Sequence, residues 1–265
     1  MVLKINSKSF MEFREKVARK EDQLFGNPKY FLIFCITTIT LILVQYSLTL
    51  NALVPAVTLG MLWLIFWGRS TATGKSYLVI ATAIGYLHEI IGVHYSWFSY
   101  ATGDFGLGVP LWVALGYGCI YWSIENFWTH AEDKHYFPEK NFRLVWALSL
   151  LSLPLLDYFV FEMSAKILPY LVFIFLLFLL FNRAKEQHLA ITVAFFCGLQ
   201  EVLGTLLGAW SHPTLSLVTI IPTYTFFVWV ILFAVHLLLK DITITRRELA
   251  IAVAIILLWV WTWFF

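Results

Sequence analysis

Charged residues are scarce in this sequence. Asp, Glu, Lys and Arg make up only 13% of the 265 residues, about half of the roughly 25% found in soluble domains. In contrast, 60% of the residues are hydrophobic, and the mean hydropathy is +0.80. This composition excludes an ordinary soluble domain and predicts an all-α polytopic membrane protein.

Cysteine and the common catalytic patterns are also lacking. The three cysteines, Cys35, Cys119 and Cys197, fall in apolar segments and have neither a disulfide framework nor metal-ligand spacing. No Gly-rich phosphate loop, Ser nucleophile elbow or basic patch suited to nucleic acid is present. We therefore expect membrane lipids and a lipophilic small molecule as partners, and no nucleic acid. The sequence does not identify a cofactor.

Long apolar runs divide the chain into segments. About nine transmembrane helices are expected, because each run is roughly 17–25 residues long. They cover 30–48, 51–68, 75–94, 109–129, 143–162, 165–181, 187–209, 215–239 and 248–265. Residues 1–29 form a basic segment with no apolar core of a signal peptide, so no leader is expected to be removed. Residues 130–142 form a linker, and 240–265 form a loop and the ninth helix.

The loop charges predict an orientation. Basic residues gather in every second loop, at Arg69, Lys75, Lys134, Lys140, Arg143, Arg183, Lys185, Lys240, Arg246 and Arg247, whereas the other loops hold only Lys166. Basic loops face the cytoplasm in most membrane proteins. We therefore expect a multi-pass protein of the inner (plasma) membrane, with its N-terminus in the cytoplasm and its C-terminus outside.

An internal repeat relates the two halves of the chain. Glu89 and Gly92 recur as Glu201 and Gly204 without a gap, and Ser99 recurs as Ser211 at the same spacing. This spacing relates 30–129 to 143–239, which predicts two parallel four-helix repeats plus a ninth helix. Four spans per repeat is an even number, so the halves should be related by a rotation of about 180° about the membrane normal.

Buried acids are the strongest functional signal. Glu89, Glu201 and Asp157 lie at similar depths in apolar segments, as does Gln45. Ionisable residues inside a membrane are costly and commonly mark active sites or ion pathways. Small residues beside both glutamates predict that they face the interior of the bundle. We assign Glu89, Glu201 and Asp157 as catalytic; the alternative is that the glutamates only lock helix packing.

Polar and aromatic residues near the same depth are expected to bind the substrate. They are Gln45, Tyr46, His88, His94, Trp97, Tyr100, Tyr158, Trp210 and His212. The histidines and acids together leave a metal site as an alternative. The paired-histidine boxes of membrane metalloenzymes are missing, however, so no metal ligand is assigned.

One stretch resembles a known family. The residues Glu89-Ile-Ile-Gly-Val, Tyr100 and Gly108-Val-Pro110-Leu are similar to the carotenoid 1,2-hydratase (bisanhydrobacterioruberin hydratase-like) membrane family. The likeness covers residues 89–111, less than a tenth of the chain, and His94-Tyr-Ser-Trp-Phe-Ser replaces the family's Gly/Phe-Gly-rich loop. It implies a hydratase-type lyase acting on an isoprenoid, with Glu89, Gly92 and Pro110 as the corresponding positions.

Two classes of function remain open. In the first, a protonated Glu89 or Glu201 donates a proton to a C=C bond of a lipophilic, possibly isoprenoid or carotenoid, substrate, and the partner carboxylate with Asp157 stabilises the cation. In the second, the same acids form the central site of a proton-coupled transporter. A metal- or cofactor-binding membrane protein is a further alternative.

The predicted topology can be tested with reporter fusions at residues 70, 102, 137 and 213. Positions 70 and 137 should report the cytoplasm, and positions 102 and 213 should report the outer side, because basic loops alternate with uncharged ones. A cytoplasmic signal at residue 102 or 213 would contradict the topology.

Overall fold

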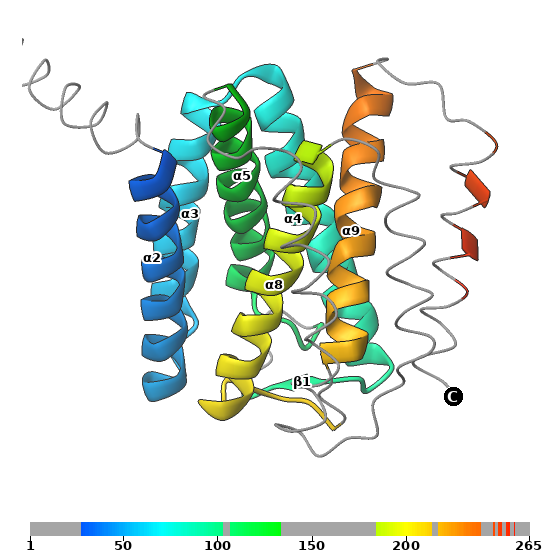
Figure 1. Ribbon diagram of the computed structural model, residues 1–265. Helices are drawn as coiled ribbons and strands as arrows, with labels where there is room; N and C mark the ends of the chain where they lie inside the picture. Colours follow the sequence, from blue (N-terminus) through cyan, green and yellow to red (C-terminus); the bar gives the residue numbers. More distant parts are fainter. Residues whose placement is uncertain are drawn as a thin grey trace, which may run out of the picture.

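The protein forms a bundle of α-helices with a short two-stranded ribbon at one end (Figure 1). This computed structural model describes residues 28–102, 107–133, 184–213 and 217–239, together with six single positions between 246 and 257. The helices are α2 (Pro28–Thr49), α3 (Leu53–Arg69), α4 (Ala72–His94), α5 (Leu111–Asp133), α8 (Ala184–Leu206) and α9 (Leu217–Leu238).

Six of the nine predicted apolar segments are confirmed as helices. They are those at 30–48, 51–68, 75–94, 109–129, 187–209 and 215–239. The segments 143–162 and 165–181, and 248–265 apart from single positions, lie outside the described residues, as do residues 1–27. The prediction of a helical protein is therefore confirmed for the described residues, most of which are helical, and three of the nine helices remain predictions.

The helix ends are set by local capping. Thr71 precedes α4, and its hydroxyl accepts a hydrogen bond from the backbone N–H of Gly74 at 3.2 Å, which fixes the start three residues before the predicted one. Before α3, the carboxamide oxygen of Asn51 accepts a hydrogen bond from the N–H of Leu53 at 3.0 Å, although the N-cap residue Ala52 makes no side-chain cap. Short polar residues thus separate the apolar helices.

Two of the described helices are long and apolar enough to cross a membrane. They run over Ala72–His94 and Lys185–Leu206. Nine spans are therefore not found in the described part of the chain.

Helix α5 lies at the centre of the bundle. It packs against α2, α3, α4 and α8, while α9 packs against α4 and α8. In Figure 1, α2 and α3 form one side of the bundle and α9 the other. The core includes Tyr46, Phe66, Leu78 and Ile124, each at most 2% exposed. The fold therefore surrounds α5 with helices on several sides.

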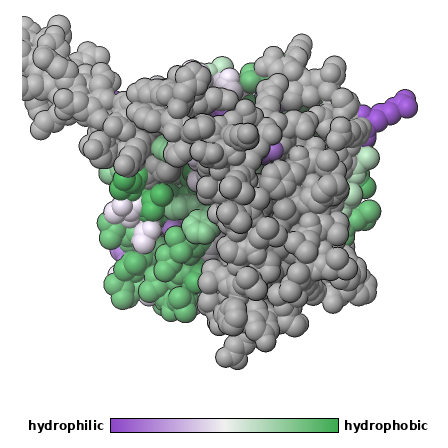
Figure 2. Space-filling view, viewed as in Figure 1, coloured by the Kyte–Doolittle hydropathy of each residue, from purple (hydrophilic) through white to green (hydrophobic). Residues whose placement is uncertain are grey.

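Apolar side chains also face outward. Leu41, Leu48, Leu53 and Leu64 are each more than 60% exposed on α2 and α3. Figure 2 shows hydrophobic residues gathered on the part of this face that the described helices form. Exposed apolar area of this kind is typical of surfaces that meet lipid or another protein.

The C-terminal ends of α4 and α8 have the same backbone geometry at equivalent positions of the repeat. The N–H of Trp97 donates to the carbonyl of Gly92 at 2.8 Å, and the N–H of Ala209 donates to that of Gly204 at 2.8 Å. The turn residue is left-handed in both, with φ of 58° at Ser96 and 72° at the corresponding glycine. Each helix thus ends in a Schellman motif, which stops α8 at Leu206 rather than at the predicted residue 209.

The segments after these two helices pair with each other. Strand β1 (Ser99–Tyr100) runs antiparallel to β2 (Trp210–Ser211). Ser99 lies opposite Ser211, its own equivalent in the repeat, and their hydroxyl oxygens are 2.8 Å apart. In the described residues the register of the repeat therefore holds for α4 with β1 and for α8 with β2. The complete four-helix repeat stays a prediction, because it includes residues 143–181.

The ribbon register predicts a specific cross-link. Ser99→Cys with Ser211→Cys should form a disulfide on mild oxidation, because Cα atoms of paired antiparallel residues are about 4.5–5.5 Å apart and disulfides span roughly 4.4–6.8 Å. Peptide mass spectrometry would detect the bond. Each single variant should give no intramolecular cross-link, because the three native cysteines are buried. Failure of the double variant to oxidise would contradict the register.

Candidate functional site

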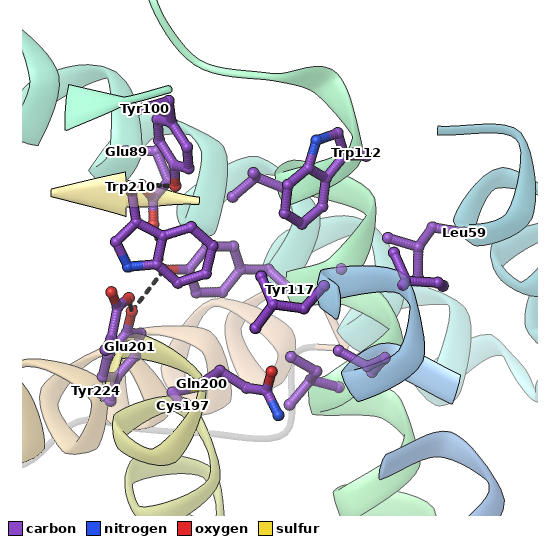
Figure 3. A pocket seen from close by; sticks show the side chains of 16 residues that line it. Leu59, Glu89, Tyr100, Trp112, Tyr117, Cys197, Gln200, Glu201, Trp210 and Tyr224 are labelled. Carbon is purple, nitrogen blue, oxygen red and sulfur yellow. Dashed lines mark hydrogen bonds between the residues drawn. The ribbon is translucent and has the colours of Figure 1, made fainter. Parts of the chain in front are cut away.

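A pocket lies at the ribbon end of the bundle, where α2, α3, α5 and α8 meet (Figure 3). Its volume is about 70 Å³, on a scale where one water needs roughly 10–15 Å³. It therefore has room for a few water-sized groups, or for a short segment of a longer apolar molecule. Most of its lining is apolar, and both Glu89 and Glu201 contribute to its wall.

Glu89 projects from α4 and is only 2% exposed. The phenol of Tyr100 donates to its Oε2 at 2.6 Å, and the phenol of Tyr117 donates to its Oε1. The partners come from β1 and α5, so three elements converge on this carboxylate. A buried carboxylate is stable only with such hydrogen bonds, and here both of its oxygens have one.

Glu201 projects from α8 and is less deeply buried, with 16% of its side chain exposed. The phenol of Tyr224, on α9, donates to its Oε1 at 2.5 Å. The Nε2 atom of His212 lies 3.1 Å from its Oε2. The imidazole is itself 5% exposed, so this carboxylate also has a hydrogen-bond partner on each oxygen.

Two phenols connect the carboxylates. The hydroxyl oxygens of Tyr117 and Tyr224 are 2.8 Å apart, and each contacts one glutamate. A continuous chain of hydrogen bonds therefore runs from Glu89 through both tyrosines to Glu201. Figure 3 shows the two glutamates from different helices with Tyr117 and Trp210 between them.

The surroundings of the two glutamates are equivalent in the repeat but differ in chemistry. Tyr100 and His212 occupy equivalent positions, and each contacts the second oxygen of its own glutamate. The two sites thus share a backbone frame, while one partner is a phenol and the other an imidazole.

Close backbone approach shapes the wall beside each glutamate. A Cβ atom on Gly204 would lie 2.0 Å from the Trp210 ring, and one on Gly92 would lie 2.3 Å from Phe98. Both aromatic rings therefore lie directly over a glycine of the preceding helix. The Trp210 ring reaches the pocket only because Gly204 has no side chain.

The remainder of the pocket is an apolar wall. Ile39, Ile42 and Leu43 of α2, Leu59 of α3 and Trp112 of α5 contribute to it. The ring of Trp112 packs on Tyr46 with centroids 5.0 Å apart. At the boundary between α2 and α8, the amide of Gln200 donates to the Thr40 hydroxyl at 3.4 Å. The pocket therefore has a polar end and an apolar end.

The electrostatics of the site are dominated by acids and phenols. No lysine or arginine is among the described residues that line the pocket. Burial and the charges of Glu89 and Glu201 raise the pKa of the Tyr100 phenol well above its ordinary value. Tyr100 therefore keeps its proton and acts as a donor at neutral pH.

Metal ligation finds no support in the described ranges. Among those residues, no group of three or more His, Cys, Asp or Glu side chains is close enough to hold a metal ion. Glu201 and His212 form a pair, with Oε2 and Nε2 3.1 Å apart. The arrangement is suited to proton transfer through hydrogen-bonded oxygens.

The structure brings together some of the residues assigned from sequence. Glu89, Glu201, Tyr100, Trp210 and His212 all lie at the polar end of the pocket or in contact with it. The catalytic assignment of Asp157 and the binding role of Tyr158 concern positions outside the described residues.

His88 and Tyr46 lie beside the pocket. The buried ring of His88 packs on Phe227, with centroids 4.7 Å apart, and on Tyr224 at 6.3 Å. Tyr46 is fully buried behind Trp112, and its hydroxyl contacts Thr102. Both residues therefore support the wall.

Three predicted binding residues do not line the pocket. The amide nitrogen of Gln45 donates to Thr49 on its own helix at 2.8 Å, because its position on α2 turns it along the helix. His94 is exposed at the end of α4 and packs on Tyr95. Trp97 packs on Tyr95 with ring centroids 5.9 Å apart, because the left-handed turn redirects the chain there.

Sequence reasoning missed Tyr117 and Tyr224. The two tyrosines are not at equivalent repeat positions, because they are 107 residues apart, whereas the equivalent Ser99 and Ser211 are 112 residues apart. A usable signal was present, since a phenol inside an apolar helix needs a hydrogen-bond partner. The nearest buried acids are the two glutamates.

Comparison of the chain with protein-family models, with curated proteins and with solved structures found no match.

The glycine contact gives a testable prediction about the site. Gly204→Ala should lower the midpoint of thermal unfolding in detergent, because its Cβ would overlap the Trp210 ring and overpacking costs about 1–3 kcal/mol. Gly68→Ala on α3 is the matched control, because nothing lies within 4 Å of its Cβ position. The control should be neutral or slightly stabilising. Equal midpoints for both variants would refute the close contact.

Proposed function

We propose that this protein is a membrane enzyme that performs acid–base chemistry on a lipophilic small molecule. The single observation that carries the proposal is the pair of hydrogen-bonded carboxylates, Glu89 and Glu201, on the wall of a mainly apolar pocket. A buried acid beside an apolar binding surface is suited to protonating a substrate that has no polar group of its own.

The proposed reaction begins with one protonated carboxyl. Its proton forms a C–H bond with one carbon of a C=C double bond, and the π electrons of that bond supply the electron pair. The neighbouring carbon becomes a cation, and the carboxyl becomes a carboxylate. Loss of a proton from an adjacent carbon completes a double-bond shift, whereas addition of water and loss of its proton completes a hydration. In both cases a carboxylate accepts the released proton.

The aromatic residues of the pocket favour this chemistry. Tyr100, Tyr117, Trp112 and Trp210 contribute to the lining, and aromatic rings attract a cation at their faces. The pocket has no lysine or arginine among its described residues, so no fixed positive charge opposes a developing cation. Asp157 is proposed as an additional stabilising carboxylate.

The substrate class follows from the apolar wall and from the sequence resemblance. The lining by Ile39, Ile42, Leu43 and Leu59 suits a hydrocarbon chain. The resemblance of residues 89–111 to the carotenoid 1,2-hydratase family favours an isoprenoid. The pocket volume suits a short segment, so the reactive double bond would lie near one end of the chain.

A membrane location supports the access of such a substrate. We propose a multi-pass protein of the plasma membrane with the predicted nine spans and two parallel four-helix repeats. The two helices long enough to cross a membrane and the exposed leucines of α2 and α3 support this proposal. A lipophilic substrate would then enter from the surrounding bilayer.

Proton-coupled transport is the second candidate. The equivalence of α4 and β1 to α8 and β2 favours it. Parallel repeats around central acids are common in transporters. The two functions differ in outcome, because transport leaves the molecule chemically unchanged. Recovery of unchanged substrate on the far side of proteoliposomes, driven by a proton gradient, would favour this alternative.

The enzymatic proposal can be tested with lycopene, an acyclic isoprenoid polyene. Protein in lipid nanodiscs should convert it in D₂O to a product that carries deuterium on carbon. Mass spectrometry would show either the added mass of a water or an isomer with a changed retention time. Glu89→Gln should reduce the rate by about 100-fold or more, because general acid catalysis contributes roughly 10²–10⁴-fold.

Glu125→Gln is the matched control for this experiment. Glu125 also lies in a helix, but it pairs with Lys185 at 3.4 Å and does not line the pocket. Its variant should retain the wild-type rate. Absence of any wild-type product, or equal activity of the two glutamine variants, would count against the proposal.

A further inference from the structure

The hydrogen bonds of the site can be counted against the hydrogens available to form them. Five contacts join Tyr100, Glu89, Tyr117, Tyr224, Glu201 and His212 into one chain. Each contact needs one hydrogen between its two heavy atoms. The three phenols and the imidazole, taken with a hydrogen on Nε2 as in the cation or the Nε2–H tautomer, supply four.

One hydrogen is therefore missing if both carboxylates are ionised. Without it, two oxygen atoms would face each other at hydrogen-bond distance with no hydrogen between them. The gap falls between the hydroxyls of Tyr117 and Tyr224, which are 2.8 Å apart. If each phenol donates its hydrogen to a glutamate, no hydrogen is left for the contact between the two phenols. Adding one proton to either glutamate completes the chain.

We infer that Glu89 and Glu201 share one proton, and that Tyr117 and Tyr224 relay it between them. This inference deepens the proposed function and rests on it only for the part the relay plays in turnover. The site then has one acid and one base at any moment, and the two roles exchange when the proton moves.

The relay conserves every proton. When Glu201 is the acid, its hydrogen points to the Tyr224 oxygen, the Tyr224 hydrogen points to the Tyr117 oxygen, and the Tyr117 hydrogen points to Glu89. Transfer of all three hydrogens along these contacts leaves both phenols neutral and moves the acid to Glu89. No bond to carbon changes, and no group outside the chain takes part.

In turnover the relay would reset the enzyme. Glu89, the more buried carboxyl, donates a proton to the substrate, and Glu201 accepts the proton that the cation or the attacking water releases. The tyrosines then return that proton to Glu89. The acid is thus regenerated inside the pocket.

Other titratable side chains lie next to this chain of hydrogen bonds but are not part of it. His88 packs against Tyr224 from α4, and Cys197 of α8 lines the same pocket. Tyr100 and His212 end the chain on its two sides. Neither His88 nor Cys197 makes one of the five contacts, so the hydrogen count does not include them.

Infrared spectroscopy of the purified full-length protein tests the shared proton without any substrate. At neutral pH the wild type should show the C=O band of one protonated carboxyl assignable to this site. The band should disappear in Glu89→Gln and also in Glu201→Gln, because the glutamine N–H₂ supplies the missing hydrogen in either position. Thermal unfolding would verify that each variant is folded.

Three results would overturn the inference. Detection of two protonated carboxyls in the wild type, or of none, would contradict the count of one shared hydrogen. A band that persists in one glutamine variant would show that the proton belongs to a single glutamate. Tyr121→Phe is the control, because this tyrosine lies one turn along α5 and its hydroxyl has no hydrogen-bond partner among the described residues; it should leave the band unchanged.

The kinetic part uses the lycopene assay. Tyr117→Phe and Tyr224→Phe should each give one fast turnover per molecule and then a steady-state rate lower by about 10²–10⁴-fold, since only the reset is lost. Tyr121→Phe should keep the wild-type steady state. Full multiple turnover in both relay variants would overturn the role in turnover. If the wild type has no activity, the proposed function fails, and the infrared result still decides the shared proton.

Discussion

Two carboxylates inside an apolar bundle are the constraint on which this structure depends. Moving an ionised carboxylate from water into an apolar interior without partners costs several kcal/mol of free energy. Each carboxylate therefore requires hydrogen-bond donors from other parts of the fold. Glu89 takes them from β1 and α5, and Glu201 takes them from the segment after β2 and from α9. The central position of α5 follows from this need, because Tyr117 must lie between the two acids. The arrangement of the bundle thus supplies hydrogen-bond donors to the carboxylate oxygens and also buries apolar side chains.

The helix ends position these donors. Each Schellman turn reverses the chain so that the following residues fold back over the last turn of the helix. Tyr100 and His212 each lie 11 residues after the glutamate that they contact. The glycines of that last turn, Gly92 and Gly204, allow an aromatic ring to lie against the backbone. A short local motif therefore creates a complete half-site, and two copies of it make the polar end of the pocket.

Much of this arrangement could be predicted from sequence. Apolar runs predicted the six described helices, and the small residues beside Glu89 and Glu201 predicted that both face the interior. Gln45 was misplaced because depth along a helix does not determine which way a side chain turns. Tyr117 and Tyr224 could not be found by aligning the halves, because they are 107 residues apart rather than 112. The repeat in the sequence predicts which backbone positions are equivalent. It does not predict which side chains from different helices come into contact, because those contacts depend on how the helices pack.

The pairing of β1 with β2 has a consequence for the symmetry of the site. Ser99 faces its own equivalent, Ser211, and Tyr100 faces Trp210, the equivalent of Phe98. A strand that pairs with a copy of itself in this way has the geometry of an isologous contact in a symmetric homodimer. The ribbon therefore joins two similar halves of one site, each supplying one glutamate to the pocket. The two halves differ in chemistry, because Tyr100 supplies a phenol where His212 supplies an imidazole.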